Sequence, residues 1–368
     1  YKAIYNSGLT IQSTQDMDIQ KICDEEVNNL ENYATEPLYS FSYRLTIEHT
    51  DGSIENFSDQ TMLSHYRASN ADYSLNFSSV EEAQAAIDAY KAEILGPGDS
   101  IPEGGESTVF TMQPQASVTI LDQYTGDVKA IVGGRGEKSG SRTLNRATST
   151  TRQPGSTFKV LAAFAPALDT AGMTLATVQD DCPFSYSNGT SLRNYDNSYH
   201  GFTTIRYAIT ESINVVTVKT MADISPQVGF DYLENFGFTT LSQDDIVESL
   251  SLGGITNGVT NLELTAAYAT IADKGTYTKP RFYTKILDHN KNVLIDNTPE
   301  THTVLKETTA FLLTDAMKDV LTKGTGSAAK FSNMPTAGKT GTTTKNRDVL
   351  FSGFTPYYTC SVWCGFDD

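Results

Sequence analysis

The sequence predicts an α+β fold, in which an antiparallel sheet packs against flanking helices and an all-helical region, with a small α+β insertion ahead of it. Strand-like runs occur near residues 118–132 and again near 350–365, and helix-like periodicity fills much of the chain between them. Residues 38–100 carry their own strand and helix signals, and a linker-like run at 102–106 follows them. A chain of 368 residues is long enough for one large and one or two small units.

The first 37 residues contain one amphipathic helix. Apolar side chains recur at spacings of three and four residues, which places them on one helix face: Ile19, Ile22, Cys23, Val27 and Leu30. We expect Asp16 or Asp18 to cap the start of this helix and Pro37 to end it.

The following segment predicts a hairpin and a helix. Alternating apolar residues from Tyr39 to Ile47 are typical of a half-buried strand, and Asp51-Gly52 is a hairpin turn signal. Ser79 and Glu82 then form a capping-box pattern. The apolar face of the helix that follows comprises Val80, Ala83, Ile87, Tyr90 and Ile94.

The remainder of the chain predicts strands, then helices, then strands. The expected strands and helices cover residues 118–120, 128–132, 156–168, 204–223, 262–274, 350–354 and 359–365, with a long loop at 133–151. Because strands at both ends of this region enclose the helices, we expect them to meet in one antiparallel sheet.

Composition excludes several classes of function. The formal net charge is −17 and no lysine- or arginine-rich stripe offsets it, so nucleic acid is excluded as a partner. Neither the four cysteines nor the five histidines have metal-site spacing, and we expect no metal or cofactor. Cys360 and Cys364 lie about 13 Å apart in the predicted strand, too far for a disulfide. There is no run of 18 apolar residues and no signal peptide, and we expect a fragment of a longer protein.

Three short polar motifs occur in order along the chain. These are S-x-x-K at Ser156 and Lys159, S-x-N at Ser212 and Asn214, and K-T-G at Lys339, Thr340 and Gly341. The first two patterns each arise about once by chance in a chain of this length, and decoys stand at Ser327 and Ser74. K-T-G is expected on the order of once in ten such chains and occurs once here. The ordered set therefore carries more information than any single motif.

The context of Ser156 favours nucleophilic catalysis over a simple helix cap. Ser156 follows Pro154-Gly155 and opens an apolar helix, where the helix dipole favours developing negative charge. Lys159 lies one turn further on and shares a face with the serine. Apolar neighbours would desolvate this lysine and lower its pKa, so that it could act as a base.

The three motifs resemble those of penicillin-binding proteins and class A β-lactamases. Further segments resemble the transpeptidase domain of class A penicillin-binding proteins: residues 153–159, 206–209, 258–264, 267–269 and 354–359, and the opening residues 8–16. Asn261 stands where the family usually has proline, and the chain stops at Asp368, before the last strand and helix of such domains. The resemblance implies three regions: a linker after an absent glycosyltransferase domain at 1–37, an insertion at 38–106, and a transpeptidase domain at 107–368.

The resemblance also implies roles for the motif residues. Ser156 would be acylated by a peptidoglycan stem peptide, or by a β-lactam, after losing its proton to Lys159. Ser212 and Lys339 would relay protons. Substrate-binding roles fall to Asn214, Thr340, Gly341 and Thr342. Backbone N–H groups of Ser156 and Thr342 would form the oxyanion hole.

Three alternatives remain open at this point. The same acyl-enzyme could be hydrolysed, as in a D,D-carboxypeptidase or a β-lactamase, or the domain could be a non-catalytic β-lactam sensor. The family resemblance favours the transpeptidase. It also implies an enzyme held on the extracytoplasmic face of a bacterial membrane by an N-terminal segment absent from this sequence, with cell-wall synthesis or division proteins as partners.

Overall fold

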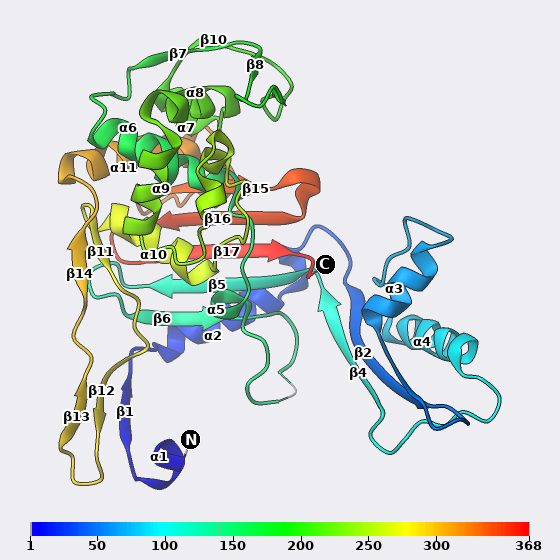
Figure 1. The fold of residues 1–368 in the computed structure, drawn as a ribbon. Coiled ribbons are helices and arrows are strands. Elements are labelled where there is room, and N and C mark those ends of the chain that lie inside the picture. The colour runs from blue at the N-terminus through cyan, green and yellow to red at the C-terminus, as the bar shows by residue number, and fades with distance from the viewer. Residues whose placement is uncertain (1, 139, 368) are drawn as a thin grey trace. The chain divides into compact units, whose positions relative to one another are not determined.

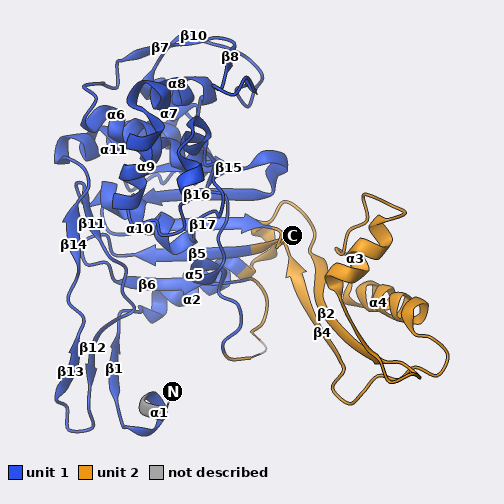
Figure 2. Ribbon diagram, viewed as in Figure 1, with its two compact units in different colours: residues 1–27, 116–134, 142–365 blue, residues 28–115, 135–141, 366–368 orange. Residues whose placement is uncertain are grey.

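The computed structural model describes residues 2–138 and 140–367; Tyr1 and Asp368, which bound two of the predicted regions, lie outside the described residues. The chain forms two compact units (Figure 2). Unit 1 comprises residues 1–27, 116–134 and 142–365, and unit 2 comprises residues 28–115, 135–141 and 366–368.

A five-stranded sheet is the centre of unit 1. Its strand order is β15-β16-β17-β5-β6, so strands from both ends of the predicted large domain lie in one sheet (Figure 1). The bounds are β5 Gln115–Leu121, β6 Val128–Val132, β15 Ala337–Thr342, β16 Asp348–Phe354 and β17 Thr359–Gly365. The β15/β16, β16/β17 and β5/β6 pairs are antiparallel. The expected antiparallel sheet is confirmed.

The helices of unit 1 lie along the whole chain, and those after residue 164 contribute to one large apolar core. They are α1 Lys2–Asn6, α2 Met17–Asn28, α5 Arg146–Ser149, α6 Ala165–Asp169, α7 Ile205–Thr210, α8 Asn214–Ile224, α9 Pro226–Asn235, α10 Asn261–Ala272 and α11 Glu307–Thr322. Helix α10 packs on β16 and β17, and α11 packs on β15. Phe158, Phe164, Tyr268 and Trp363 are among the buried residues of this core.

Short strands complete unit 1 around the sheet and helices. They are β1 Thr10–Ser13, β7 Val178–Asp181, β8 Phe184–Ser185, β9 Ser191–Leu192, β10 Gly201–Thr204, β11 Thr276–Thr278, β12 Tyr283–Leu287, β13 Val293–Asp296 and β14 Thr301–Thr303. They form the sheet β1-β12-β13 and the pairs β7/β10, β8/β9 and β11/β14. The β7/β10 pair lies near α8 (Figure 1).

Helix α2 begins as predicted but ends earlier. Asp16 caps it, because its Oδ1 accepts from the N–H groups of Asp18 and Ile19. The helix stops at Asn28, well before Pro37. Ile22 is 59% exposed, so the predicted apolar face is too wide.

One polar residue of α2 is buried instead. The Gln20 side chain pairs with the edge strand β6, donating to Ile131 O at 3.1 Å and accepting from Ile131 N at 2.9 Å. A buried amide is tolerated where both of its polar atoms find partners in this way.

Unit 2 is a three-stranded sheet covered by two helices. Its strands are β2 Leu38–Glu48, β3 Ile54–Ser58 and β4 Glu106–Gln113, in the order β3-β2-β4, and its helices are α3 Asp59–Arg67 and α4 Val80–Ile94. The alternating side chains Tyr43, Leu45 and Ile47 point into its core, as predicted. The capping box at α4 is incomplete: Ser79 Oγ accepts from Glu82 N, but the Glu82 carboxylate accepts from Ser78 N.

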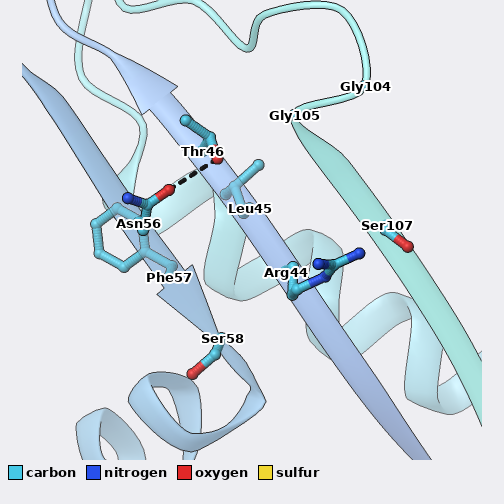
Figure 3. A pocket seen from close by; sticks show the side chains of 9 residues that line it. All are labelled: Arg44, Leu45, Thr46, Asn56, Phe57, Ser58, Gly104, Gly105 and Ser107. Carbon is cyan, nitrogen blue, oxygen red and sulfur yellow. Dashed lines mark hydrogen bonds between the residues drawn. The ribbon is translucent and has the colours of Figure 1, made fainter.

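The sheet of unit 2 also lines an open pocket of about 490 Å³ (Figure 3). Arg44, Thr46, Asn56 and Ser107 are among its lining residues, and Thr46 Oγ1 donates to Asn56 Oδ1 at 2.8 Å. None of the predicted site residues lines this pocket.

None of the helices in the described residues combines the length and hydropathy that a membrane span requires.

Candidate active site

Ser156 lies on a tight helical turn, not at the start of a regular α-helix. The predicted helix over residues 156–168 is a succession of a 3₁₀ turn at Gly155–Thr157, a π-helix at Lys159–Phe164 and α6. Side chains of the π-helix are all buried, so the apolar helix behind Ser156 is present with a different winding. Such π-helical turns are frequent at functional sites.

Glycine at position 155 brings the Ser156 turn against strand β15. Gly155 has φ +53°, and a Cβ added to it would lie 2.9 Å from Thr342 O. A Cβ added to Gly341 would likewise lie 2.8 Å from Pro154 O. The two backbones therefore approach each other in a way that only glycine permits on either side.

The Ser156 side chain is partly exposed. Among the described residues, none forms a hydrogen bond with its hydroxyl, so the expected bond between Ser156 Oγ and Lys159 Nζ is not formed in this structure. Hydrogen bonds between catalytic groups are often long or unformed without substrate and tighten only in the complex. The hydroxyl is thus available to a ligand.

Lys159 is fully buried and bonded to the second motif. Its Nζ lies 2.5 Å from Ser212 O, 2.6 Å from Asn214 Oδ1 and 3.1 Å from Ser212 Oγ. Burial lowers the pKa of this lysine well below its ordinary value, and the positive charge of Lys339 lowers it further. A neutral amine can donate its two hydrogens to the two carbonyl oxygens and keep its lone pair for a hydroxyl.

Ser212 lies in a break between two helices, α7 and α8. Its backbone adopts φ +58°, an uncommon conformation for serine, and its side chain is 8% exposed. The predicted single helix at 204–223 is therefore wrong, because α7 ends at Thr210 and α8 begins only at Asn214. Non-glycine residues held in this conformation concentrate at functional sites, where the surrounding structure enforces it.

Lys339 approaches the same hydroxyl from the sheet. Its Nζ lies 2.9 Å from Ser212 Oγ, and its side chain is fully buried on β15. Burial lowers the pKa of Lys339 to about 7, while the nearby Glu211 carboxylate acts in the opposite direction. Burial therefore favours the neutral form of both lysines, and the charge of Lys339 adds to this effect at Lys159.

The remaining predicted residues lie along the same strand or beside it. Thr340 Oγ1 is 2.8 Å from Thr325 Oγ1, and Thr342 is exposed at the end of β15. The decoy Ser327 begins a short 3₁₀ turn, Ser327–Ala329, with an exposed side chain. The structure thus joins Lys159, Ser212, Asn214 and Lys339 by hydrogen bonds and places the Ser156 turn against β15. Within the described residues, no group of three or more metal-ligating side chains is arranged to hold a cation.

Two contacts that support the site lie outside the three catalytic motifs. Tyr268 Oη donates to Thr157 O at 2.8 Å and so ties α10 to the Ser156 turn. Arg152 and Val259 exchange two backbone hydrogen bonds, of 2.9 and 2.8 Å. Both contacts join segments about 110 residues apart, which is why local patterns do not reveal them.

Comparison with known proteins covers the segment that contains these site residues. The family model for the penicillin-binding protein transpeptidase domain matches residues 116–361. The chain belongs to this family. The resemblance drawn from the three motifs is confirmed.

Curated relatives of the chain include penicillin-binding proteins 1A and 1A/1B. Penicillin-binding protein 1A of Clostridium acetobutylicum is 39% identical over 270 residues, which are 70% of this chain and 33% of that protein. Penicillin-binding protein 1A/1B of Bacillus subtilis is 33% identical over 280 residues, which are 72% of this chain and 30% of that protein. The chain spans about a third of the length of these curated relatives.

Solved structures share the fold. The PonA1 protein from Mycobacterium tuberculosis, in complex with penicillin V, matches with a TM-score of 0.68 and 21% identity, covering 99% of this chain and 79% of that chain. This likeness confirms the predicted fold class of penicillin-binding transpeptidase domains.

Asn261, where the resemblance implies a proline, connects a helix to the central sheet. Asn261 is the first residue of α10, a position that accepts proline readily. Its Nδ2 donates to Ser361 O at 3.1 Å, which links α10 to β17. Asparagine at this position thus gives the start of α10 a hydrogen bond to the central sheet.

Proposed function

We propose that this domain is a serine D,D-transpeptidase that cross-links peptidoglycan stem peptides through an acyl-enzyme on Ser156. The observation that carries the proposal is the bonding of two buried lysines, Lys159 and Lys339, to the single hydroxyl of Ser212 beside the Ser156 turn. Buried lysines with lowered pKa values are suited to proton transfer near neutral pH. Membership of the transpeptidase family supports the same reaction.

The acylation step follows from these contacts. Neutral Lys159 takes the proton of the Ser156 hydroxyl as its oxygen attacks the carbonyl of the penultimate D-Ala, and a C–O bond forms. When the tetrahedral intermediate collapses, the C–N bond to the terminal D-Ala breaks. The proton then passes through Ser212 and Lys339 to the departing amine. An amine from a second stem peptide then attacks the acyl-enzyme, and a new C–N bond forms as the C–O bond to Ser156 breaks. The proton of the amine returns to the Ser156 oxygen, which restores the enzyme.

Substrate orientation is assigned to β15 and α8. The terminal carboxylate binds at Thr340 and Thr342 and is attracted by the charge of Lys339, while Gly341 leaves room for the Ser156 turn. Asn214 holds the substrate amide. Backbone N–H groups of Ser156 and Thr342 stabilise the oxyanion, and each such donor contributes about 3–4 kcal/mol.

β-Lactams enter this scheme as substrate mimics. Their strained amide acylates Ser156, but no separate amine departs to vacate the site. The resulting adduct is long-lived in a transpeptidase, whereas a β-lactamase would hydrolyse it. The duration of the adduct therefore separates the two reactions.

The whole protein is proposed to be larger than this chain. We propose that residues 1–37 link the transpeptidase domain, 107–368, to a glycosyltransferase domain, and that 38–106 is an insertion. An N-terminal anchor would hold the enzyme at the outer face of the bacterial membrane, near other cell-wall synthesis or division proteins. Roughly a third of a relative's length leaves room for these parts.

Intact-mass measurement tests the proposal. After penicillin treatment we expect one stoichiometric adduct, on a peptide that contains Ser156, and transfer of a D-Ala-D-Ala donor to an amine acceptor. Ser156→Ala should form no adduct, and Ser327→Ala, at the decoy, should form it normally. Retention of the adduct in Ser156→Ala would refute the assignment. Fast turnover of the β-lactam would indicate hydrolysis, and an adduct without transfer would indicate a sensor.

A further inference from the structure

A buried polar network holds the start of α8 from outside the three motifs. Asn214 is the first residue of α8, and Ile213 at its N-cap has no side-chain oxygen to accept from the helix. Asn194, from a loop 20 residues earlier in the chain, supplies that acceptor. Its Oδ1 lies 3.0 Å from Asn214 N and 3.2 Å from Val215 N. The helix cap is therefore donated by a distant residue, which is 3% exposed.

The same loop fixes the side chain of Asn214. Its Nδ2 donates to the Arg193 carbonyl oxygen at 2.7 Å. This bond decides which end of the amide faces the site, so Oδ1 points to Lys159 Nζ at 2.6 Å. Residues 193 and 194 thus hold both the backbone and the amide of Asn214.

Asp181 holds Asn194 in turn. Its two carboxylate oxygens each accept from Asn194 Nδ2 at 2.9 Å. Its Oδ2 also accepts from His200 N at 2.9 Å and lies 2.8 Å from His200 Nδ1. The carboxylate side chain is fully shielded from solvent. A buried carboxylate with this many donors is a rigid anchor, since moving it would leave a charge unpaired.

We propose that Asp181 and Asn194 are positioning residues for acylation, which set the place and orientation of Asn214 and, through it, of Lys159. This inference rests on the proposed function of Lys159 as the base. The Asp181 carboxylate contacts the Asn194 amide, and Asn194 Oδ1 accepts from the backbone N–H of Asn214. The side chain of Asn214 then contacts the Lys159 amine. Neither positioning residue contacts Ser156. Because a misplacement of about 1 Å can slow an enzyme about 100-fold, a loosened anchor has a measurable kinetic effect.

Exchange of the two side chains provides a sharp test. Asn194→Asp places a second carboxylate against Asp181 and removes the donor, while it keeps an acceptor for α8. In the double variant Asp181→Asn, Asn194→Asp, the amide at 181 can donate to the carboxylate at 194, and the carboxylate can still cap α8. The bond between positions 181 and 194 is thereby restored with donor and acceptor reversed, and the cap of α8 is kept. The bond from Asn194 Nδ2 to Ser198 O, 2.9 Å, is lost equally in the single and the double variant. Asp180→Asn is the matched control, because Asp180 is the adjacent residue on β7 and is exposed.

Acylation by a fluorescent penicillin should be followed by stopped flow, to separate the acylation rate constant k2 from the binding constant K. Active-site titration gives the fraction of folded, reactive molecules. We expect Asn194→Asp to lower k2 of the reactive fraction at least about tenfold, with a smaller change in K. The double variant should return to within about threefold of the parent chain, and Asp180→Asn should match it. A merely structural role would reduce the reactive fraction and leave k2 unchanged, and that result would overturn the proposal. So would a double variant no faster than Asn194→Asp.

Amide hydrogen exchange provides a readout that does not depend on acylation. Asn194→Ala should accelerate exchange in the peptide that contains Asn214 and Val215, and Asp180→Asn should not. Unchanged exchange in Asn194→Ala would refute the positioning role even if penicillin never reacted. A parent chain that forms no adduct, with accelerated exchange in Asn194→Ala, would instead refute the proposed function alone.

Discussion

Replacing Lys339 by glutamine should move the pH dependence of acylation. The Nζ atoms of Lys159 and Lys339 share Ser212 Oγ at 3.1 and 2.9 Å, so they lie at most about 6 Å apart, the sum of the two distances. At an effective dielectric constant of about 20, two unit charges at this distance repel by about 3 kcal/mol. That energy corresponds to about two pH units in the pKa of Lys159.

The direction of the change follows from the charge of Lys339. The positive charge lowers the pKa of Lys159, so removing it raises that pKa. A larger fraction of Lys159 is then protonated and unable to act as a base. The acidic limb of k2 against pH should move upward in Lys339→Gln, by about two pH units or more where Lys339 is charged in the parent chain. Because the pKa of Lys339 is about 7, the effect should appear below neutral pH, where Lys339 is charged in the parent chain.

Stopped-flow acylation from pH 5 to pH 10 measures this shift. The constant k2 should be separated from K, because Lys339 also attracts the substrate carboxylate in the proposed function. Lys330→Gln is the matched control, since Lys330 is the exposed lysine of the decoy motif and should leave the profile unchanged. An acidic limb that stays in place, or moves downward, in Lys339→Gln would refute the electrostatic coupling of the two lysines.

Three further predictions concern stability and geometry. Lys339→Met should raise the melting temperature most below pH 7 and less towards pH 10.5. The reason is that a lysine with a lowered pKa in the folded state destabilises the fold while it is charged. Equal increases in melting temperature at both pH values, measured by thermal denaturation, would contradict this. Gly155→Ala should lower k2 by about 100-fold, because the added Cβ would meet Thr342. Gly189 also has a positive φ but has open space around it, so Gly189→Ala should leave k2 unchanged. Equal losses of k2 in the two variants would show that backbone strain alone is responsible. Asn261→Pro should change the free energy of unfolding, measured by urea titration, by less than about 1 kcal/mol. The rigidity of proline at the helix start offsets the lost hydrogen bond to β17. A larger loss of stability would show that this hydrogen bond contributes more than the rigidity does.

Elements with strong local signals were predictable from the sequence. The strand β6 and the α4 helix follow from apolar periodicity, because each has one face in a core, and β5 was also predicted although both of its faces are buried. The three motifs also indicated the correct family, since their order is rarely met by chance. The roles of the individual site residues remain predictions.

Features set by tertiary contacts were not predictable. Ser212 interrupts a segment without glycine or proline, and its positive φ is enforced by the residues around it. Asn194 caps α8 from 20 residues earlier in the chain, with β10 and α7 between them, and no local motif indicates that contact. Gln20 is buried although amides usually lie at the surface, because Ile131 satisfies both of its polar atoms.

The pairing of Gln20 with Ile131 has a consequence for how the central sheet ends. Strand β6 is the last strand on that side, and unpaired edge strands invite association with other chains. The Gln20 side-chain amide donates to and accepts from Ile131, as a peptide group of a neighbouring strand would. Asp16 N adds a further hydrogen bond to this edge, to Lys129 O at 2.8 Å. On the opposite side, β15 faces the Ser156 turn. Residues 16–20 therefore cover the β6 edge at Lys129 and Ile131, and a chain that lacks them is expected to expose that edge to pairing with other chains.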